Sequence, residues 1–228
     1  MNEDIVAYGR TLKNCLLENG ASQVGFARLS GSQYVSGISI LLRIPADVVR
    51  SIDDGPNMAY FDQYHILNAQ LDKLATLGAR YIQETGFNAL PMTTDKVKEY
   101  GNYMTELPHK TVATLAGLGW IGKSALLVTP TYGSAIRLTT ILTDMPLEYG
   151  TPVKESACGN CTRCESACPG MAISGKRWNV TMQRDEFFDV IKCRAKARQL
   201  SKERMNKAIT LCGKCIEVCP YTQKYIGH

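Results

Sequence analysis

Eight of the nine cysteines lie after residue 157, and four of them fall within eleven residues. Cys158, Cys161, Cys164 and Cys168 are separated by two, two and three residues, and Pro169 follows the last one. This C-x2-C-x2-C-x3-C-P spacing places thiolate ligands for iron–sulfur clusters, and its fourth cysteine ligates a second cluster. The spacing therefore predicts a [4Fe-4S] centre and a neighbour that shares the motif.

A second group of cysteines completes the ligand count. Cys193 stands alone, whereas Cys212, Cys215 and Cys219 are closely spaced, and Pro220 follows Cys219. We expect one cluster on Cys158, Cys161, Cys164 and Cys219, and the other on Cys168, Cys193, Cys212 and Cys215. Zinc is the main rival because C-x2-C pairs also bind it, but zinc rarely needs three cysteines at this spacing followed by C-P.

The composition is that of a globular protein without a membrane segment. No run of about 18 apolar residues occurs, and the opening "MNEDIVAYGR" has neither the basic nor the apolar region of a signal peptide. A cytoplasmic location is expected, where cysteines at such spacings bind metal rather than form disulfides. The formal net charge is +5, but two clusters with four thiolates each would lower it to about +1.

Periodicity and turn signals predict an α+β fold. A long helix is expected over residues 57–85, and another over "KTVATLAGLG". Strands are expected at "QVGFARL", "GISILLRI", "NALPM", "ALLVT" and "AIRLTTILT". After "DMPLEYGTPV" cysteines appear, the apolar runs shorten and prolines follow cysteines. A domain boundary is therefore placed near residue 150, giving a core at 1–150 and a ferredoxin-like module at 151–228.

The densest stretch outside the cysteines is "LPHKTVATLAGLGWIGKSALLVTPTYGS", at residues 107–134. Gly117, Gly119 and Gly122 permit either close approach of backbone to a ligand or tight packing against a neighbouring strand. A helix-to-strand turn with Trp120 as a packing residue is the alternative that needs no ligand. The spacing matches neither a dinucleotide-binding fingerprint nor a P-loop.

"HKTVATLAGLGWIGKSALLVT" followed by "CGNCTRCESACP" closely resembles the epoxyqueuosine reductases, relatives of the corrinoid-dependent reductive dehalogenases. The resemblance covers residues 105–220 well and the first hundred loosely. It implies a nitroreductase-like core that buries a base-off cobalamin against the clusters, largely through backbone. The residues that it implies as the corrin lining are Gly117, Leu118, Gly119, Trp120, Gly122, Lys123, Ser124, Leu127, Gly133, Ser134 and Leu138.

The chain departs from that pattern in three places. The reductases continue into a helical-repeat domain that helps to hold tRNA, whereas this sequence stops eight residues after Pro220. Counting back twenty residues from Lys123, to where the family's aspartate proton donor would lie, reaches Tyr103, and the nearest upstream acid is Asp95. Dehalogenases use a tyrosine as donor, so Tyr103 is an acceptable acid in principle, but a surface or packing role is the slightly favoured interpretation. Their usual twin-arginine signal is missing.

Two functional hypotheses follow. The first is an anaerobic oxidoreductase whose clusters pass low-potential electrons to a bound cobalamin that reduces a substrate, with Tyr103 or Asp95 supplying a proton. The second is a ferredoxin-like electron-transfer protein, or a corrinoid reductase, with no small-molecule substrate of its own. The basic segment "KCRAKARQLSKERMNK" is a solvated face or a docking surface for an acidic donor such as flavodoxin or ferredoxin. It has no aromatic residues, which weakens the case for tRNA.

Overall fold

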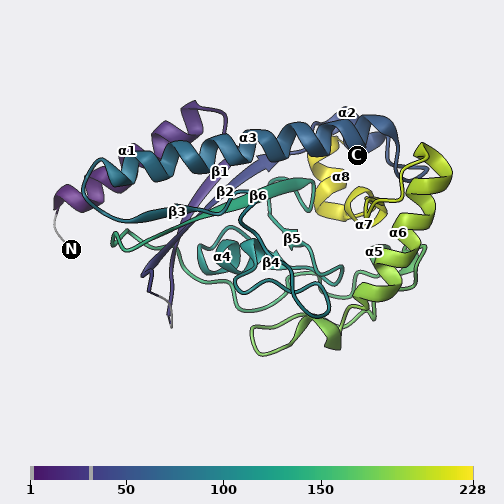
Figure 1. Cartoon of the computed structure of the whole chain (residues 1–228). Coiled ribbons are helices and arrows are strands. Elements are labelled where there is room, and N and C mark those ends of the chain that lie inside the picture. The colour runs from purple at the N-terminus through teal and green to yellow at the C-terminus, as the bar shows by residue number, and fades with distance from the viewer. Residues whose placement is uncertain (1–2, 31–32, 228) are drawn as a thin grey trace. The chain divides into compact units, whose positions relative to one another are not determined.

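The computed structural model describes residues 3–30 and 33–227 (Figure 1). They form two compact units, each assembled from three separate segments of the chain. Unit 1 consists of Met1–Arg43, Leu67–Leu118 and Arg137–Val153, and unit 2 consists of Ile44–Ile66, Gly119–Ile136 and Lys154–His228. The chain passes from unit 1 to unit 2 for the last time between Val153 and Lys154, close to the boundary expected near residue 150. Two segments from the first 150 residues, Ile44–Ile66 and Gly119–Ile136, nevertheless belong to the same unit as the cluster cysteines.

Helices and strands occur in short runs rather than in strict alternation, and the last part of the chain is helical, as in an α+β fold. The helices are α1 (Glu3–Glu18), α2 (Ala46–Arg50), α3 (Met58–Gln83), α4 (His109–Leu115), α5 (Arg163–Ser166), α6 (Val190–Met205), α7 (Lys214–Glu217) and α8 (Pro220–Ile226), with a 3-10 turn at Arg184–Glu186. The strands are β1 (Gln23–Arg28), β2 (Ser36–Arg43), β3 (Ala89–Pro91), β4 (Trp120–Ile121), β5 (Leu127–Val128) and β6 (Ile136–Thr143). None of the described helices has the length and apolar character that crossing a membrane needs.

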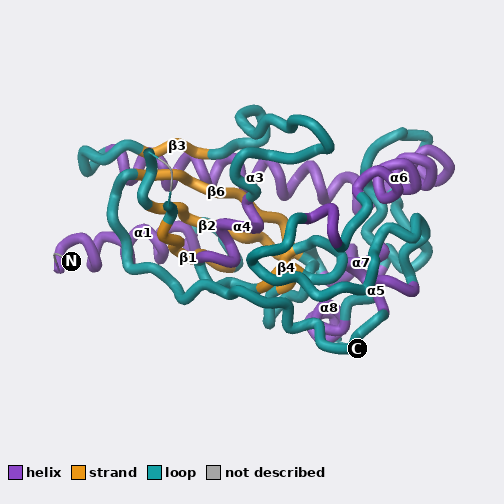
Figure 2. The backbone as a smooth tube through the Cα atoms, turned by 90° about the horizontal axis from the view of Figure 1, so that it is seen from below, coloured by secondary structure: helices purple, strands orange, loops and turns teal. Residues whose placement is uncertain are grey.

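Unit 1 is a four-stranded sheet in the order β1-β2-β6-β3, covered by helices on both faces. Figures 1 and 2 show α1 and α3 over one face and α4 over the other. All of β2 except Arg43 is buried, because neither face of this strand reaches solvent. Glycines let these helices pack closely on the sheet. A Cβ at Gly37 of β2 would lie 2.7 Å from the Val112 side chain of α4, and a Cβ at Gly78 of α3 would lie 2.6 Å from the Ile141 side chain of β6.

Unit 2 contains little regular structure. The β4–β5 ribbon pairs Trp120 with Val128 and Ile121 with Leu127, and α5, α7 and α8 each have seven residues or fewer. Helices this short gain little stability alone. Metal binding supplies folding free energy in such small cysteine-rich modules, so the sparse elements agree with a domain organised around its thiols.

Candidate metal centre

Short turns and helical ends position the cysteines of unit 2. The backbone N–H of Cys158 donates to Ser156 Oγ at 3.4 Å, and that of Cys161 donates to the Cys158 carbonyl at 3.1 Å. Cys164 lies on α5 and Cys215 on α7. Cys219 is the N-cap of α8, whose first residue is Pro220. A proline suits the first helical position because that N–H has no partner within the helix.

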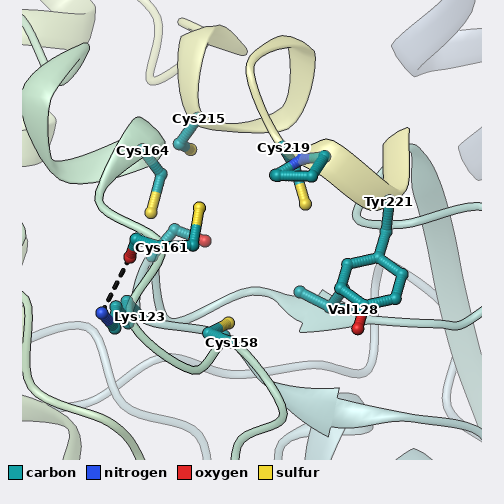
Figure 3. A pocket seen from close by; sticks show the side chains of 11 residues that line it. Lys123, Val128, Cys158, Cys161, Cys164, Cys215, Cys219 and Tyr221 are labelled. Carbon is teal, nitrogen blue, oxygen red and sulfur yellow. Dashed lines mark hydrogen bonds between the residues drawn. The ribbon is translucent and has the colours of Figure 1, made fainter. Parts of the chain in front are cut away.

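The thiols of Cys158, Cys161, Cys164 and Cys219 surround one cavity, of about 40 Å³. Figure 3 shows their sulfur atoms facing this common space. Cys215 also lines it, together with Gly122, Lys123, Ser124, Val128, Pro220 and Tyr221. Within residues 3–30 and 33–227, no three His, Cys, Asp or Glu side chains are placed to hold a single metal ion. The structure thus brings together the four thiols that the spacing assigned to one cluster.

The other four cysteines interact with one another. Burial, followed by the nearby thiols of Cys168 and Cys212, raises the pKa of Cys193 to about 11. Burial, together with the nearby thiols of Cys212 and Cys193, raises the pKa of the Cys215 thiol well above its ordinary value. Cys164 also contributes to the shift at Cys215. Cys215 is therefore close to members of both groups.

The donor set fits a metal cluster. Burial and the thiols of Cys158 and Cys219 raise the pKa of Cys164 to about 11, so without metal this sulfur keeps its proton at neutral pH. A bound cation reverses that preference, because thiolates are the ligating form and metal binding displaces their protons. A buried group of thiols that resists ionisation alone is suited to the charge of iron.

Lys123 introduces a positive charge at the same cavity. Its side chain is only 5% exposed, and Nζ donates to the Cys161 carbonyl at 2.8 Å (Figure 3). A buried ammonium needs hydrogen bonds and a compensating charge. The hydrogen bond ties the turn after β4 to the first cysteine loop, and a thiolate-ligated cluster would supply the negative charge.

The glycines expected to approach a ligand instead approach other parts of the chain. A Cβ at Gly119 would lie 2.2 Å from the Val128 carbonyl oxygen, and one at Gly133 2.2 Å from the Thr222 backbone nitrogen. At Gly117 a Cβ would lie 2.7 Å from the Thr151 carbonyl oxygen. Of the two interpretations, tight packing against neighbouring backbone accounts for these three glycines.

Two buried polar atoms in the same stretch remain available to a ligand. Trp120 Nε1 and Ser134 Oγ have no hydrogen-bond partner among the described residues, although the two residues are only 6% and 2% exposed. The Trp120 ring packs edge-on against Tyr221, with centroids 4.9 Å apart. Leaving such groups unsatisfied costs about 1–3 kcal/mol each. Trp120 thus reaches the cavity wall through Tyr221, and the Ser134 N–H donates to Thr222 Oγ1, one residue further along α8, at 3.1 Å.

The other residues expected to line a corrin divide between the units. Ser124 and Leu127 are buried in unit 2, whereas Gly117, Leu118 and Leu138 belong to unit 1. The expected strand from Gly133 to Leu138 begins later, at Ile136. Gly133 has φ +58°, a left-handed conformation that a regular strand does not contain.

Both candidate proton donors lie on exposed loops of unit 1. Tyr103 is 39% exposed and lies between Tyr100 and Met104, which form an isolated antiparallel bridge. Asp95 Oδ1 accepts a hydrogen bond from Thr93 Oγ1 at 2.5 Å. That bond is the main reason the pKa of Asp95 is held below its ordinary value, so the carboxyl group is ionised and poorly suited to donating a proton.

Sequence reasoning missed Tyr221 and Val128 as cavity residues. Tyr221 follows Cys219-Pro220 and lies in the first turn of α8, which turns its ring toward the cavity (Figure 3). The Cys-Pro pair was the available signal, since a residue just after a ligand at a helix start remains near the metal. Val128 offered no comparable signal because its place depends on pairing with Trp120.

Comparisons with known proteins agree with this geometry. Residues 157–222 match the family described as "4Fe-4S double cluster binding domain", which confirms the prediction of two [4Fe-4S] clusters. Epoxyqueuosine reductase of Lactococcus garvieae is 30% identical over 167 residues, covering 73% of this chain and 44% of the relative. That of Listeria monocytogenes is 33% identical over 130 residues, covering 54% and 32%.

Solved structures share the fold at lower identity. The catabolic reductive dehalogenase NpRdhA matches with a TM-score of 0.76 and 19% identity, over 96% of this chain and 33% of that one. An epoxyqueuosine reductase bound to a modified tRNA stem loop matches with a TM-score of 0.62 and 21% identity, over 96% and 66%. These matches confirm the predicted resemblance and the fold class. The chain spans less than half the length of both curated relatives.

Proposed function

We propose that this chain, similar to epoxyqueuosine reductases and reductive dehalogenases, is an iron–sulfur oxidoreductase that delivers low-potential electrons to a bound cobalamin. The cobalamin would reduce an electrophilic substrate that the sequence does not name. The observation that carries the proposal is the thiol cavity, and the buried, unpartnered Trp120 Nε1 and Ser134 Oγ support its ligand-binding part. The cavity would hold metal, and the two polar atoms would bind a large polar ligand.

Each of the eight cysteines after residue 157 has a role in this proposal. Four thiolates would hold the cluster in the cavity: Cys158, Cys161, Cys164 and Cys219. The other four would hold its partner: Cys168, Cys193, Cys212 and Cys215. The proximity of Cys215 to both groups supports neighbouring clusters, as expected when one motif supplies ligands to two centres. Lys123 would offset part of the negative charge of the first cluster.

The remaining residues would bind and orient the corrinoid. When bound, cobalamin supplies a cobalt centre that reaches low oxidation states and reduces electrophiles. Trp120 Nε1 would donate to the amide rim, and the Ser134 hydroxyl would donate or accept there. Tyr103 is the better candidate for the proton donor, because the hydrogen bond from Thr93 keeps Asp95 ionised.

Corrinoid retention tests the proposal directly. Protein with reconstituted clusters is mixed with hydroxocobalamin under anaerobic conditions and passed through a desalting column. Retained corrin with a base-off spectrum is expected, and less of it in a Trp120→Phe/Ser134→Ala double variant. Ser39→Ala is the matched control, because Ser39 Oγ is also buried and unpartnered but belongs to unit 1. Elution of free cobalamin from the wild-type protein would refute the corrinoid proposal.

A second candidate is an electron-transfer protein without a substrate of its own. The packing of Gly119 and Gly133 against Val128 and Thr222 favours it, because that backbone is already occupied by other parts of the chain. The desalting experiment separates the two candidates, since only the first retains corrin. Under either candidate we propose a cytoplasmic, anaerobic protein that receives electrons from another protein. tRNA, which is bound by a related reductase, remains the less favoured partner.

A further inference from the structure

We propose that an acidic one-electron carrier protein docks on the outward face of α6 and on the adjacent Met171. This α6 surface comprises Met171, Ile191, Lys192, Arg198 and Lys202. The inference rests on the proposed cluster function, and it names the partner and the point at which electrons enter. In the transfer, the reduced carrier loses one electron and the cluster gains one, and no bond or proton moves.

The helix presents two distinct faces. Cys193, Ala197, Ser201 and Met205 recur every four residues; the last three are buried, and Cys193 is partly buried. Ser201 Oγ donates to the Leu211 carbonyl at 2.6 Å, which fixes this face inward. Ile191, Arg198 and Lys202 lie on the opposite side and are exposed. The proposed ligand Cys193 therefore faces the interior of unit 2, and the opposite face meets solvent.

One end of the α6 surface, at Met171 and the start of the helix, lies near two proposed ligands of one cluster. The N–H of Met171 donates to the Cys168 carbonyl at 3.0 Å. A Cβ at Gly170 would lie 3.0 Å from Lys196 Cβ and 3.1 Å from the Lys192 carbonyl oxygen, so this turn lies against the start of α6. Cys168 and Cys193 are thus each within three residues of the place where Gly170 meets Lys192 and Lys196. Electrons arriving here would have a short path to the second cluster.

The chemistry of the surface fits an acidic protein. Between Val190 and Met205 the chain carries six basic residues and one acid, Glu203. Met171 is 81% exposed and Ile191 54%, which provides apolar area within a basic surrounding. Protein interfaces combine an apolar centre with a charged rim, and electron-transfer interfaces are small and steered by charge.

Nucleic acid and a second copy of the chain fit less well. The helix contains no Phe, Trp or Tyr, so it offers no stacking platform for bases. The exposed Met171 and Ile191 have no use on a phosphate backbone, which is bound by charge. The six basic residues of α6, against one acid, would repel the same face of a second copy.

Stopped-flow reduction tests the surface. Cluster-loaded full-length protein is mixed with photoreduced flavodoxin, an acidic one-electron carrier, and the bleaching near 400 nm is followed at several salt concentrations. The Arg198→Glu/Lys202→Glu variant should react about tenfold or more slowly at low salt and converge with wild type at high salt. Arg198→Glu alone is compared with Lys224→Glu, at an exposed lysine on α8, because the two single variants change the net charge by the same amount. Arg198→Gln/Lys202→Gln gives a smaller loss if charge reversal disturbs folding.

Reduction by dithionite separates failure of this inference from failure of the proposed function. Dithionite needs no docking surface, so wild type and variants should bleach with it at the same rate. If dithionite bleaches the clusters and the flavodoxin rates of the α6 variants equal that of Lys224→Glu, the docking site is wrong. If those variants lose binding of a tRNA stem loop while their flavodoxin rates are unchanged, the surface belongs to nucleic acid. No bleaching with dithionite would overturn the cluster function itself, and the docking proposal with it.

Discussion

Replacing Lys123 by Met should lower the reduction potential of the cluster in the thiol cavity. The substitution keeps most of the side-chain volume and removes a positive charge that is 5% exposed and hydrogen-bonded to the Cys161 carbonyl at 2.8 Å. Reduction adds an electron to an already negative cluster. A nearby ammonium therefore favours the reduced state, and its loss makes reduction harder.

Coulomb's law gives the size of the effect. Lys123 lines the cavity that would hold the cluster, and for a separation on the order of 7 Å at an effective dielectric constant of about 20, a unit charge contributes about 2 kcal/mol. For a one-electron couple this is about 100 mV. We expect the midpoint potential of Lys123→Met to be lower by roughly this amount, and the missing hydrogen bond to destabilise the fold by about 1 kcal/mol.

Potentiometric titration monitored by electron paramagnetic resonance provides the measurement. Lys224→Met makes the same charge change at an exposed site on α8, where solvent screens it, so its potential should stay near that of wild type. Equal potentials for Lys123→Met and Lys224→Met, with full iron content in both, would refute the reasoning. A potential raised by the loss of Lys123 would do the same.

Three further predictions concern stability and metal content. Gly119→Ala should cost about 3 kcal/mol or more in urea unfolding, because its Cβ would lie 2.2 Å from the Val128 carbonyl oxygen; a normal midpoint would contradict that packing. Burial lowers the pKa of His109 to about 4. Above pH 6.5 the histidine is neutral in both the folded and unfolded states, and the protein is more stable than in acid by up to about 3 kcal/mol. This stability is lost as the pH falls from 6.5 toward 4, because the folded state resists protonation of the buried ring. The decline in unfolding free energy from pH 7 to 5 should be smaller in His109→Gln, and an equal decline would exclude this histidine as a cause. Cys219→Ser should lose about half the iron, whereas Cys15→Ser should lose none; the reverse pattern would overturn the ligand assignment.

The cluster-binding region could be predicted because its signal is local. The spacing between two cysteines that bind one cluster is set by the number of residues that the turn between them needs. Cys158, Cys161 and Cys164 can therefore be recognised as candidate ligands without knowledge of the fold. The long helix expected at 57–85 is observed as Met58–Gln83 for a similar reason, since a helix satisfies its hydrogen bonds within one segment.

Features that depend on distant segments could not be read in this way. Unit 2 includes Ile44–Ile66 and Gly119–Ile136 as well as the cysteine-rich segment. No local sequence pattern indicates that these segments belong together. The close packing of Gly119 and Gly133 depends on where Val128 and Thr222 lie in space. In sequence, a glycine that approaches another backbone cannot be distinguished from one that approaches a ligand.

Anaerobic iron and acid-labile sulfide analysis, with electron paramagnetic resonance after dithionite reduction, tests the central claim most directly. Two [4Fe-4S] clusters predict about eight irons and about eight sulfides per chain, and signals broadened by coupling between neighbouring clusters. Stoichiometric zinc, or about four irons with the signal of one isolated cluster, would contradict the account.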